Sequence, residues 1–341
     1  MKHFEFWHPR LFELPYYLYL LGGCALRLLP IKSLAKANYA LDHGEIGIGS
    51  KVHTQFAFDQ THFLPTKAIP DTLNPMAKES LVQQFGEEHG YPLILKSDIG
   101  SVGKGVAKLH GSNEIAARIS NLRGPYLVQK YTTHNCEFGV FFVRRQGKGE
   151  ITGINRKHFP SITGDGVRTL GELAANHERA TAHWQTFLQY LDTSSVPADG
   201  EVVQLSFIGS HTMGCKFTDD SDLVTPALSD AVSALFESQP GFNFGRLDVK
   251  AESLAAFQAG DFIVIEVNGV ASLPTHMFDP AKSVWQAWRE FLRHGRLLLE
   301  IADEHRKQPM ALASYPDIIR RVRENAGLLN DAHQQLMREV S

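Results

Sequence analysis

Two polar residues, Glu266 and Asn268, interrupt an apolar run late in the chain, in the sequence FIVIEVNG. The β-branched residues of this run predict a buried strand over residues 261–267. Because successive side chains of a strand alternate between its faces, Glu266 and Asn268 point to the same side. A carboxylate beside an amide oxygen needs hydrogen-bond donors or a hard cation. The pair alone is equally compatible with a metal site and with a strand end satisfied by backbone groups of the next loop.

A glycine-rich segment is the second candidate for chemistry. The sequence KSDIGSVGKGV places Gly100, Gly103 and Gly105 between two expected strands, with Lys96 at its start. Glycines let the backbone approach a ligand closely, and successive N–H groups can hold an anion, so phosphate is the natural ligand. The order GxxGxG is neither the dinucleotide fingerprint nor a Walker A loop. A glycine-rich hairpin with solvated lysines accounts for this segment equally well.

Composition limits the classes of protein to consider. The chain has 341 residues, of which 43% are hydrophobic and 21% charged, as in a soluble globular protein with more than one core. A net charge of −3 gives no electrostatic case for a nucleic acid partner. The 16 histidines show no HExxH or Cys/His ligand spacing. Three widely separated cysteines suit a reducing cytoplasm.

The N-terminal region contains an uncharged run over residues 14–26, LPYYLYLLGGCAL. This run is shorter than the ~20 residues that cross a bilayer as a helix. Glu5 and Glu13 precede it, which is atypical of a signal peptide. We expect a buried helix. Its aromatic residues leave a peripheral membrane contact through residues 1–30 as the alternative.

The elements that must position these residues are a mixture of strands and helices. Strands are predicted at 91–97, 126–131, 136–145, 150–155, 202–208, 244–250 and 261–267, and residues 98–109 are predicted to be a turn that returns as a strand. Helices are predicted at 51–62, 75–89, 113–122, 170–191, 225–237, 281–306 and 315–340. Residues 64–70 read as a proline-bounded link. Because strands and helices do not alternate regularly, the predicted fold class is α+β.

Several segments, in order along the chain, resemble the ATP-grasp superfamily. YPLILKSDIGSVGKGV resembles its phosphate-grasping hairpin, YLVQKYTTHNCEF its adenine-binding hinge, and GRLDV with IVIEVNGVASLP its magnesium site. INRKHFPSITGDGVRTLGEL is similar to the central segment of cyanophycin-synthetase-like and D-alanine–D-alanine-ligase-like members. The resemblance covers about residues 51–280. It implies the ATP-grasp fold, in which two α+β subdomains grip ATP.

This resemblance also implies a division of the chain. Residues 1–50 would be an apolar helical segment with a glycine-rich loop, and 51–135 the first ATP-grasp subdomain with the phosphate-loop hairpin. Residues 136–280 would be the catalytic subdomain with the magnesium site, and 281–341 the C-terminal helices. Family members usually carry a Rossmann-like domain ahead of the first phosphate-binding lysine, whereas 50 residues precede Lys51 here. That departure leaves the identity of the substrates open.

Roles for individual residues follow from the same resemblance. The nucleotide ligands that it implies are Lys51, Lys96, Gly100, Ser101, Gly103, Gly105, Gln129, Lys130, Tyr131 and Glu137. The lysines at 51 and 96 and the glycine loop would contact phosphates, residues 129–131 the adenine edge, and the glutamate the ribose hydroxyls. The metal ligands that it implies, for Mg²⁺ or alternatively Mn²⁺, are Asp248, Glu266 and Asn268.

Two basic residues match catalytic positions of the family. Arg246 precedes Asp248 by two residues, hence on the same strand face, and would stabilise charge on an acylphosphate and the tetrahedral intermediate. Lys157, or alternatively Arg156, would reach the γ-phosphate. Arg168 is either a ligand of the second substrate or a surface residue at a helix start.

The implied activity joins a carboxylate to an amine, in amino acids or peptide-like molecules, with release of ADP and phosphate. ATP and Mg²⁺ would be the cofactors, and small-molecule substrates, not nucleic acid, the partners. Two alternatives stay open: an ATP-grasp phosphotransferase without an amine acceptor, and a non-catalytic nucleotide-binding module peripheral to a membrane. A homodimer is compatible with the sequence. We expect a cytoplasmic protein, at the inner face of the membrane if its N-terminus binds lipid.

Overall fold

The computed structural model describes residues 4–46, 49–99, 105–119, 122–179, 191–211 and 214–338, the last seven by their backbone alone. Contacts divide the chain into two units, each assembled from separate stretches. Unit 1 comprises Met1–Leu64, Thr132–Arg156 and Phe217–Asn325, and unit 2 comprises Pro65–Tyr131, Lys157–Lys216 and Ala326–Ser341. Both contain helices and antiparallel sheets, so the predicted α+β class is confirmed.

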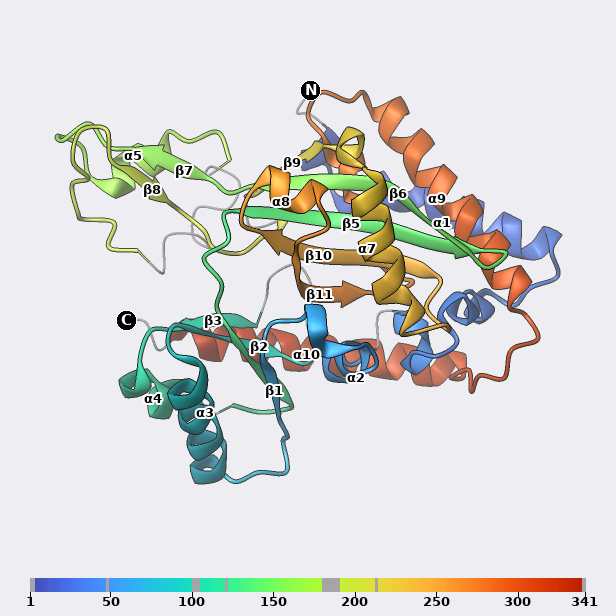
Figure 1. Ribbon diagram of the computed structural model, residues 1–341, viewed down its shortest axis with the longest axis horizontal. Helices are drawn as coiled ribbons and strands as arrows, with labels where there is room; N and C mark the ends of the chain where they lie inside the picture. Colours follow the sequence, from blue (N-terminus) through green and yellow to red (C-terminus); the bar gives the residue numbers. More distant parts are fainter. Residues whose placement is uncertain are drawn as a thin grey trace. The chain divides into compact units, whose positions relative to one another are not determined.

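Unit 1 is built on a five-stranded sheet with the order β11-β10-β5-β6-β9 (Figure 1). Its strands are β5 (Cys136–Arg145), β6 (Lys148–His158), β9 (Lys216–Asp219), β10 (Phe244–Ala251) and β11 (Ile263–Asn268). Strand β10 pairs antiparallel with β5 on one side and β11 on the other. Its side chains therefore meet those of both neighbours on each face of the sheet.

One face of this sheet packs against α1 (Pro9–Leu26) and α9 (Val284–Glu304). The strand residues that enter this core are Phe141, Val143 and Phe244. Helix α9 begins with a capping box, in which the hydroxyl of Ser283 accepts from the backbone of Gln286 while the Gln286 side chain accepts from that of Ser283. The two helices lie against each other along rings of Tyr16 and Phe291, which stack at 3.9 Å.

The opposite face of the sheet packs against α7 (Pro226–Glu237) and α8 (Leu254–Gln258). The alternate strand residues, Val140, Phe142, Leu247 and Val249 among them, enter this second core. Helix α7 begins at Pro226, directly after the N-cap Thr225. The sheet is thus the middle layer of unit 1, and its polar residues must occupy positions that neither core covers.

Short helices connect the N-terminal part of unit 1 to its sheet. They are η1 (Phe4–Phe6), η2 (Ile31–Asn38), η3 (Asp42–Glu45), α2 (Lys51–Phe56) and η4 (Gln60–His62). The turn His43–Gly44–Glu45 has three successive positive φ angles of 49°, 62° and 56°. This turn contacts the loop that follows β11, in which the Val270 N–H donates to the Gly44 carbonyl at 3.1 Å.

Unit 2 contains a four-stranded sheet with the order β1-β4-β2-β3 and a two-stranded sheet of β7 and β8. Its strands are β1 (Thr66–Ile69), β2 (Leu93–Ser97), β3 (Val106–Leu109), β4 (Tyr126–Lys130), β7 (Ser161–Thr163) and β8 (Val202–Gln204). Its α-helices among the described residues are α3 (Pro75–His89), α4 (Ile115–Ile119) and α5 (Leu170–Ala175). The C-terminal helix α10 (Tyr315–Arg338) contains the boundary between the units.

None of the helices among the described residues combines the length and apolarity that a single membrane span requires. The pair formed by α1 and η2, bent by 94°, meets the requirement by length and composition.

Candidate functional site

The predicted metal ligands come together in unit 1 because of the register between β10 and β11. Arg246 lies opposite Asn268, and Asp248 lies opposite Glu266. Since alternate residues of a strand share a face, these four side chains are on one face of the sheet. We call them, with Lys51, Glu45, Glu137 and Lys250, the ionic cluster.

Arg246 and Asp248 form a bidentate ion pair within β10. Arg246 Nε donates to Asp248 Oδ1 at 2.9 Å and Nη2 to Oδ2 at 3.1 Å, while Nη1 donates to the Leu273 carbonyl at 3.4 Å. Only 5% of Asp248 is exposed. Burial alone would lower the pKa of Arg246, but Asp248, then Glu266 and Glu137, raise it above its usual value. The guanidinium therefore stays charged and fixed in direction.

Lys51 forms the second ion pair of the cluster, from its Nζ to Oε1 of Glu266. It is the first residue of α2, whose N-cap Ser50 accepts from the His53 N–H at 3.1 Å. Burial lowers the pKa of Lys51, yet the carboxylates of Glu266 and Glu45 outweigh that effect and raise the pKa above its usual value. Lys51, predicted as a phosphate ligand, is thereby placed beside a predicted metal ligand.

Glu45 belongs to the cluster although its local sequence gives no sign of it. Its Oε2 accepts from the Gly269 N–H at 2.8 Å and its Oε1 from the Thr54 hydroxyl. Burial raises the pKa of Glu45, and the hydrogen bonds from Thr54 and Gly269 and the charge of Lys51 oppose that rise. A further carboxylate thus faces the lysine that pairs with Glu266.

Glu137 lies opposite Lys250 in the pairing of β5 with β10. Its carboxylate is buried, and Oε2 is 3.6 Å from Lys250 Nζ. Lys250 is two residues from Asp248 on β10, so Glu137, the predicted ribose ligand, lies on the same sheet face as Asp248. The cluster combines four carboxylates with three cationic side chains, all drawn from unit 1.

Asn155 on β6 is a polar residue that sequence reasoning missed. Its Oδ1 accepts from the Thr275 hydroxyl, while its buried Nδ2 has no hydrogen-bond partner among the described residues. A Cβ at Gly139 would lie 2.2 Å from Asn155 Oδ1 and 3.1 Å from Arg246 Cδ. Asn155 and Arg246 therefore flank the space that Gly139 leaves open. The free amide is a donor suited to an anionic oxygen.

Predicted nucleotide ligands of unit 2 form a separate polar chain. Lys96 Nζ on β2 donates to Gln129 Oε1 on β4 at 2.8 Å, and Gln129 Nε2 donates to the Thr66 hydroxyl at 2.9 Å. The backbone N–H of Lys130 donates to the Pro65 carbonyl at 2.9 Å, and that of Tyr131 to the Pro92 carbonyl at 3.3 Å. These contacts fix the strand ends on which the predicted phosphate and adenine ligands lie.

The remaining predicted residues are placed individually. Gly100, Ser101 and Gly103 lie outside the described residues. Gly105 has a φ of 71°, and its carbonyl accepts from the Ser97 N–H at 2.8 Å. Lys157 is a buried residue of β6 that belongs to unit 2. 

Arg168 lies two residues before the first residue of α5. This position agrees with the second of its two predicted alternatives, a surface residue at a helix start. Its side chain is exposed, and Nε is 2.6 Å from Asp165 Oδ2. Hydrogen bonds from the backbone and side chain of Arg168 lower the pKa of Asp165 to about 2. This local ion pair fits a surface residue that organises a helix start.

The chemistry of the donor set fits a hard divalent cation. Asp248 and Glu266 supply carboxylate oxygens from facing positions, and Asn268 supplies an amide group whose Nδ2 is 3.4 Å from Asp248 Oδ2. Carboxylate and amide oxygens are ligands that Mg²⁺ accepts while it keeps some of its waters. The cations Lys51 and Arg246 beside them suit the phosphate or carboxylate oxygens that such an ion bridges.

Comparison with known sequences gave no match to a family model and none to a curated protein. Comparison with solved structures found a bifunctional glutathione synthetase from Pasteurella multocida, at 16% identity and a TM-score of 0.37 over 71% of this chain and 36% of that one. It also found a carboxyaminoimidazole ribonucleotide synthase from Aspergillus clavatus complexed with ATP. The identity is 13% and the TM-score 0.38, over 65% of this chain and 44% of that one. A D-alanine–D-alanine ligase from Bacillus anthracis matches at 11% identity and a TM-score of 0.43, over 76% of this chain and 70% of that one.

The chain spans less than half the length of the first two of these structures. All three TM-scores lie below 0.5. A functional assignment therefore depends on the residues of the site.

Proposed function

We propose that this chain is an ATP-dependent ligase of the ATP-grasp type, which joins a carboxylate to an amine through an acylphosphate and releases ADP and phosphate. The observation that carries the proposal is the register of β10 and β11, which sets Asp248 opposite Glu266 and Arg246 opposite Asn268. The sequence motifs that resemble the superfamily predict these four residues as one site. Their arrangement on one face supports that prediction.

Within the proposed site, Asp248, Glu266 and Asn268 would hold Mg²⁺, or Mn²⁺ in its place. The bound ion would neutralise charge on the phosphates of ATP. Lys51 would bind phosphate oxygens beside it. In unit 2, Lys96 and the loop that ends at Gly105 would do the same.

The other roles are proposed from side-chain chemistry. Arg246 would bind the anionic oxygens of the acylphosphate. Asn155 Nδ2, which has no hydrogen-bond partner in the described part of the chain, would donate to the same group. Glu137 would accept from the ribose hydroxyls, residues 129–131 would meet the adenine edge, and Lys157 would reach the γ-phosphate. These groups position the reactants and stabilise charge, which is most of what phosphoryl transfer asks of a protein.

The direct test is a screen for ADP release with ATP and Mg²⁺ across amino acids, dipeptides and polyamines, with mass spectrometry of the products. A ligase releases ADP only when a carboxylate and an amine are both present, and the product contains the new amide. Asp248→Asn should abolish that release, and Glu300→Gln, a surface change at the Arg145 ion pair, serves as the matched control. ADP release without an amine would identify a phosphotransferase. ATP binding without any turnover would identify a non-catalytic module.

We also propose that the exposed side of α1 contacts a lipid surface. Phe12, Tyr16 and Leu20 face the core, whereas the other side of the helix also presents large apolar residues. The exposed residues on that side include Leu11 (67%), Leu14 (50%), Leu18 (59%) and Leu21 (53%). A helix that is apolar on all sides needs a second apolar neighbour. The charges of Arg10 and Arg27 at its two ends suit anionic headgroups.

Sedimentation with vesicles tests this contact. We expect binding to vesicles that contain phosphatidylglycerol, weaker binding to phosphatidylcholine alone, and loss of binding for Leu14→Glu with Leu18→Glu. Retention of vesicle binding by that double variant would contradict the proposal. A dimer in light scattering that the same double variant dissociates would instead assign this side to a second copy of the chain.

A further inference from the structure

A second group of titratable side chains lies in unit 1, outside the ionic cluster. His276 belongs to η9 (Thr275–Phe278), and Glu290 and His294 are separated by four positions on α9. Residues with this spacing share one side of a helix. One ligand atom from each of the three lies within 4.8 Å of the other two. We call these three residues the histidine cluster.

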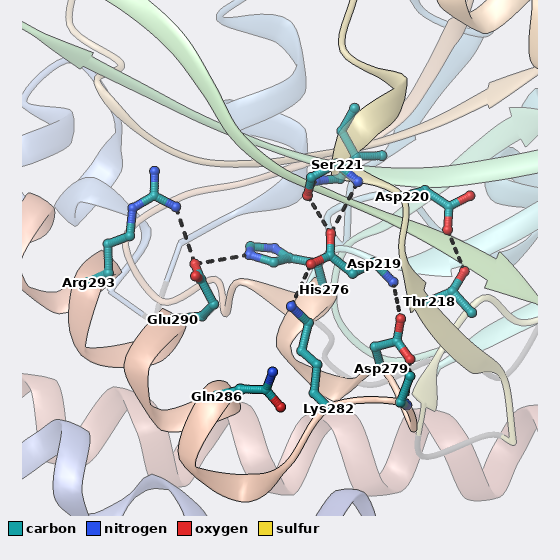
Figure 2. Close-up of polar contacts among 12 residues, drawn as sticks. Thr218, Asp219, Asp220, Ser221, His276, Asp279, Lys282, Gln286, Glu290 and Arg293 are labelled. Carbon is teal, nitrogen blue, oxygen red and sulfur yellow. Dashed lines mark hydrogen bonds and ion pairs between the residues drawn. The ribbon is translucent and has the colours of Figure 1, made fainter.

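We propose that the histidine cluster binds a transition-metal ion, with Zn²⁺ as the natural occupant. Two imidazoles and a carboxylate form a recurrent zinc ligand set, which leaves a fourth position for water. His276 Nε2 is 3.5 Å from Glu290 Oε2, and Figure 2 shows the ring pointing at that carboxylate. Two ligands on one tetrahedral Zn²⁺ are separated by roughly 3.3 Å, given bonds of about 2.0 Å. The pair is therefore close to ligand spacing.

His294 is held in the tautomer that a metal needs. Its Nδ1 is 2.8 Å from the Glu290 carbonyl, which can only accept, so Nδ1 carries the proton and Nε2 keeps its lone pair. Metal-bound histidines usually make such a bond through the outer nitrogen. The ring thus offers Nε2 as a ligand atom in its neutral form, which is the form that binds metal.

The hydroxyl of Thr152 is the present neighbour of this lone pair, at 3.0 Å from His294 Nε2. The same hydroxyl lies 3.5 Å from the Phe141 carbonyl. Thr152 therefore has a second acceptor to which it can turn when Nε2 binds an ion. The exchange would leave no buried donor unpaired.

The position of His276 depends on a glycine. A Cβ at Gly153 would lie 2.1 to 2.7 Å from three atoms of the His276 ring, and 3% of His276 is exposed. The nearby Asp219 is engaged elsewhere, with Oδ2 at 2.6 Å from Lys282 Nζ and Oδ1 accepting from Ser221 (Figure 2). We therefore do not count Asp219 among the ligands.

A plain ion pair is the competing interpretation. Arg293 Nη1 is 3.2 Å from Glu290 Oε2, so Glu290 has two cationic neighbours when His276 is protonated. Hydrogen bonding from His276 lowers the pKa of Glu290 to about 2, against the effect of its burial. This interpretation accounts for His276 and Glu290. It leaves His294 Nε2 as the acceptor for the Thr152 hydroxyl, and it predicts no affinity for metal.

Metal binding by the full-length, chelator-treated protein separates the two interpretations. We expect Zn²⁺ to bind at one equivalent in equilibrium dialysis with elemental analysis, and Co²⁺ to give the visible absorption of a tetrahedral site. Glu290→Gln should weaken Zn²⁺ binding about a hundredfold or more, since loss of even an outer-shell partner costs ten- to a hundredfold. Glu300→Gln, on the same helix, is the matched control and should bind as the wild type does.

Glu290 is 25% exposed, so its amide variant should fold, which circular dichroism would check. His276→Gln provides a second test, because it removes one ligand and leaves the Glu290–Arg293 contact in place. Absence of saturable Zn²⁺ and Co²⁺ binding by the wild type would overturn the proposal, as would equal Zn²⁺ affinities of the wild type and Glu290→Gln. These readouts are independent of ADP release and hence of the proposed ligase activity.

Discussion

The ionic cluster and the histidine cluster compensate the charge of their carboxylates in different ways. In the ionic cluster, Asp248 and Glu266 face Arg246 and Lys51, whose pKa values are raised above values that already lie far above neutral pH. In the histidine cluster, Glu290 faces His276, while the buried His294 stays neutral. Removing one partner of an ion pair with a permanent cation lowers the stability strongly, because the other charge is left uncompensated. A histidine site, by contrast, responds to pH and to metal ions.

The largest expected loss of stability comes from breaking the ion pair between Arg246 and Asp248. Asp248→Ala would leave the guanidinium of Arg246 largely buried without its carboxylate, at a cost of about 3–5 kcal/mol in the free energy of unfolding. Urea unfolding followed by circular dichroism would measure it. The double variant Arg246→Met with Asp248→Leu should regain most of the loss, because neither charge then remains. A loss below about 1 kcal/mol in the single variant would show that the pair is effectively solvated.

The next effect concerns catalysis under the proposed function. Glu266→Gln keeps the shape of the side chain but removes one charge, so kcat for ADP release should fall about a hundredfold or more. Raising the Mg²⁺ concentration should recover part of the loss. The measurement is ADP release against Mg²⁺ concentration, with Glu300→Gln as control. Normal turnover of Glu266→Gln at low Mg²⁺ would leave the pair with Asn268 as a polar strand end.

The response to pH should separate the two clusters. Burial lowers the pKa of His294 to about 3, so between that value and about 6.5 the unfolded chain binds a proton that the folded chain does not. Its contribution to stability is complete above pH ~6.5 and is lost as the pH falls toward 3. From pH 7 to pH 5 the loss is about 2 kcal/mol. Glu290, with a pKa of about 2, stays ionised over this range.

Urea midpoints at pH 7 and pH 5 would test this for the wild type and His294→Gln. The wild type should lose about 2 kcal/mol more than the variant on going to pH 5. Equal losses in both proteins would mean that His294 is protonated in the folded state or that the acid effect arises elsewhere.

The smallest expected losses of stability come from replacing two glycines, one beside each cluster, by alanine. Gly139→Ala would crowd Asn155 and Arg246, and Gly153→Ala would crowd the His276 ring, each at about 1–3 kcal/mol. Gly22→Ala on α1 is the control, since its Cβ would meet nothing within 4 Å and alanine favours helix. Thermal unfolding would compare the three. A neutral Gly153→Ala would show that the His276 ring moves aside without cost.

Sequence reasoning predicted the elements that local patterns determine. Helix α3 occupies Pro75–His89 as predicted, because Asn74 caps it and Pro75 suits its first turn. The shared side of Glu266 and Asn268 followed from strand alternation and is observed in the register with β10. Strand β1 was missed, because Pro65 and Pro70 bound it and read as a link. It lies at a sheet edge, where prolines are tolerated.

The parts of the sites that could not be predicted depend on long-range contacts. In place of the single helix predicted over residues 51–62, the structure has two shorter ones, α2, which ends at Phe56, and η4. The histidine cluster has no HExxH spacing, and its only local signal is the Glu290–His294 spacing of four on an amphipathic helix. His276 joins them through the fold. Glu45 meets Gly269 across 224 positions of sequence, so no local pattern could place it.

The strained turn at residues 43–45 depends on contacts that are distant in sequence. Left-handed backbone costs an L-residue about 1–2 kcal/mol, and His43 and Glu45 both adopt it. The bonds that compensate, from Gly269 to the Glu45 side chain and from Val270 to the Gly44 carbonyl, come from the loop after β11. We expect the turn to form late, once β11 has joined the sheet, because the bonds that offset its strain join residues distant in sequence. Mutations in this turn should therefore accelerate unfolding more than they slow folding.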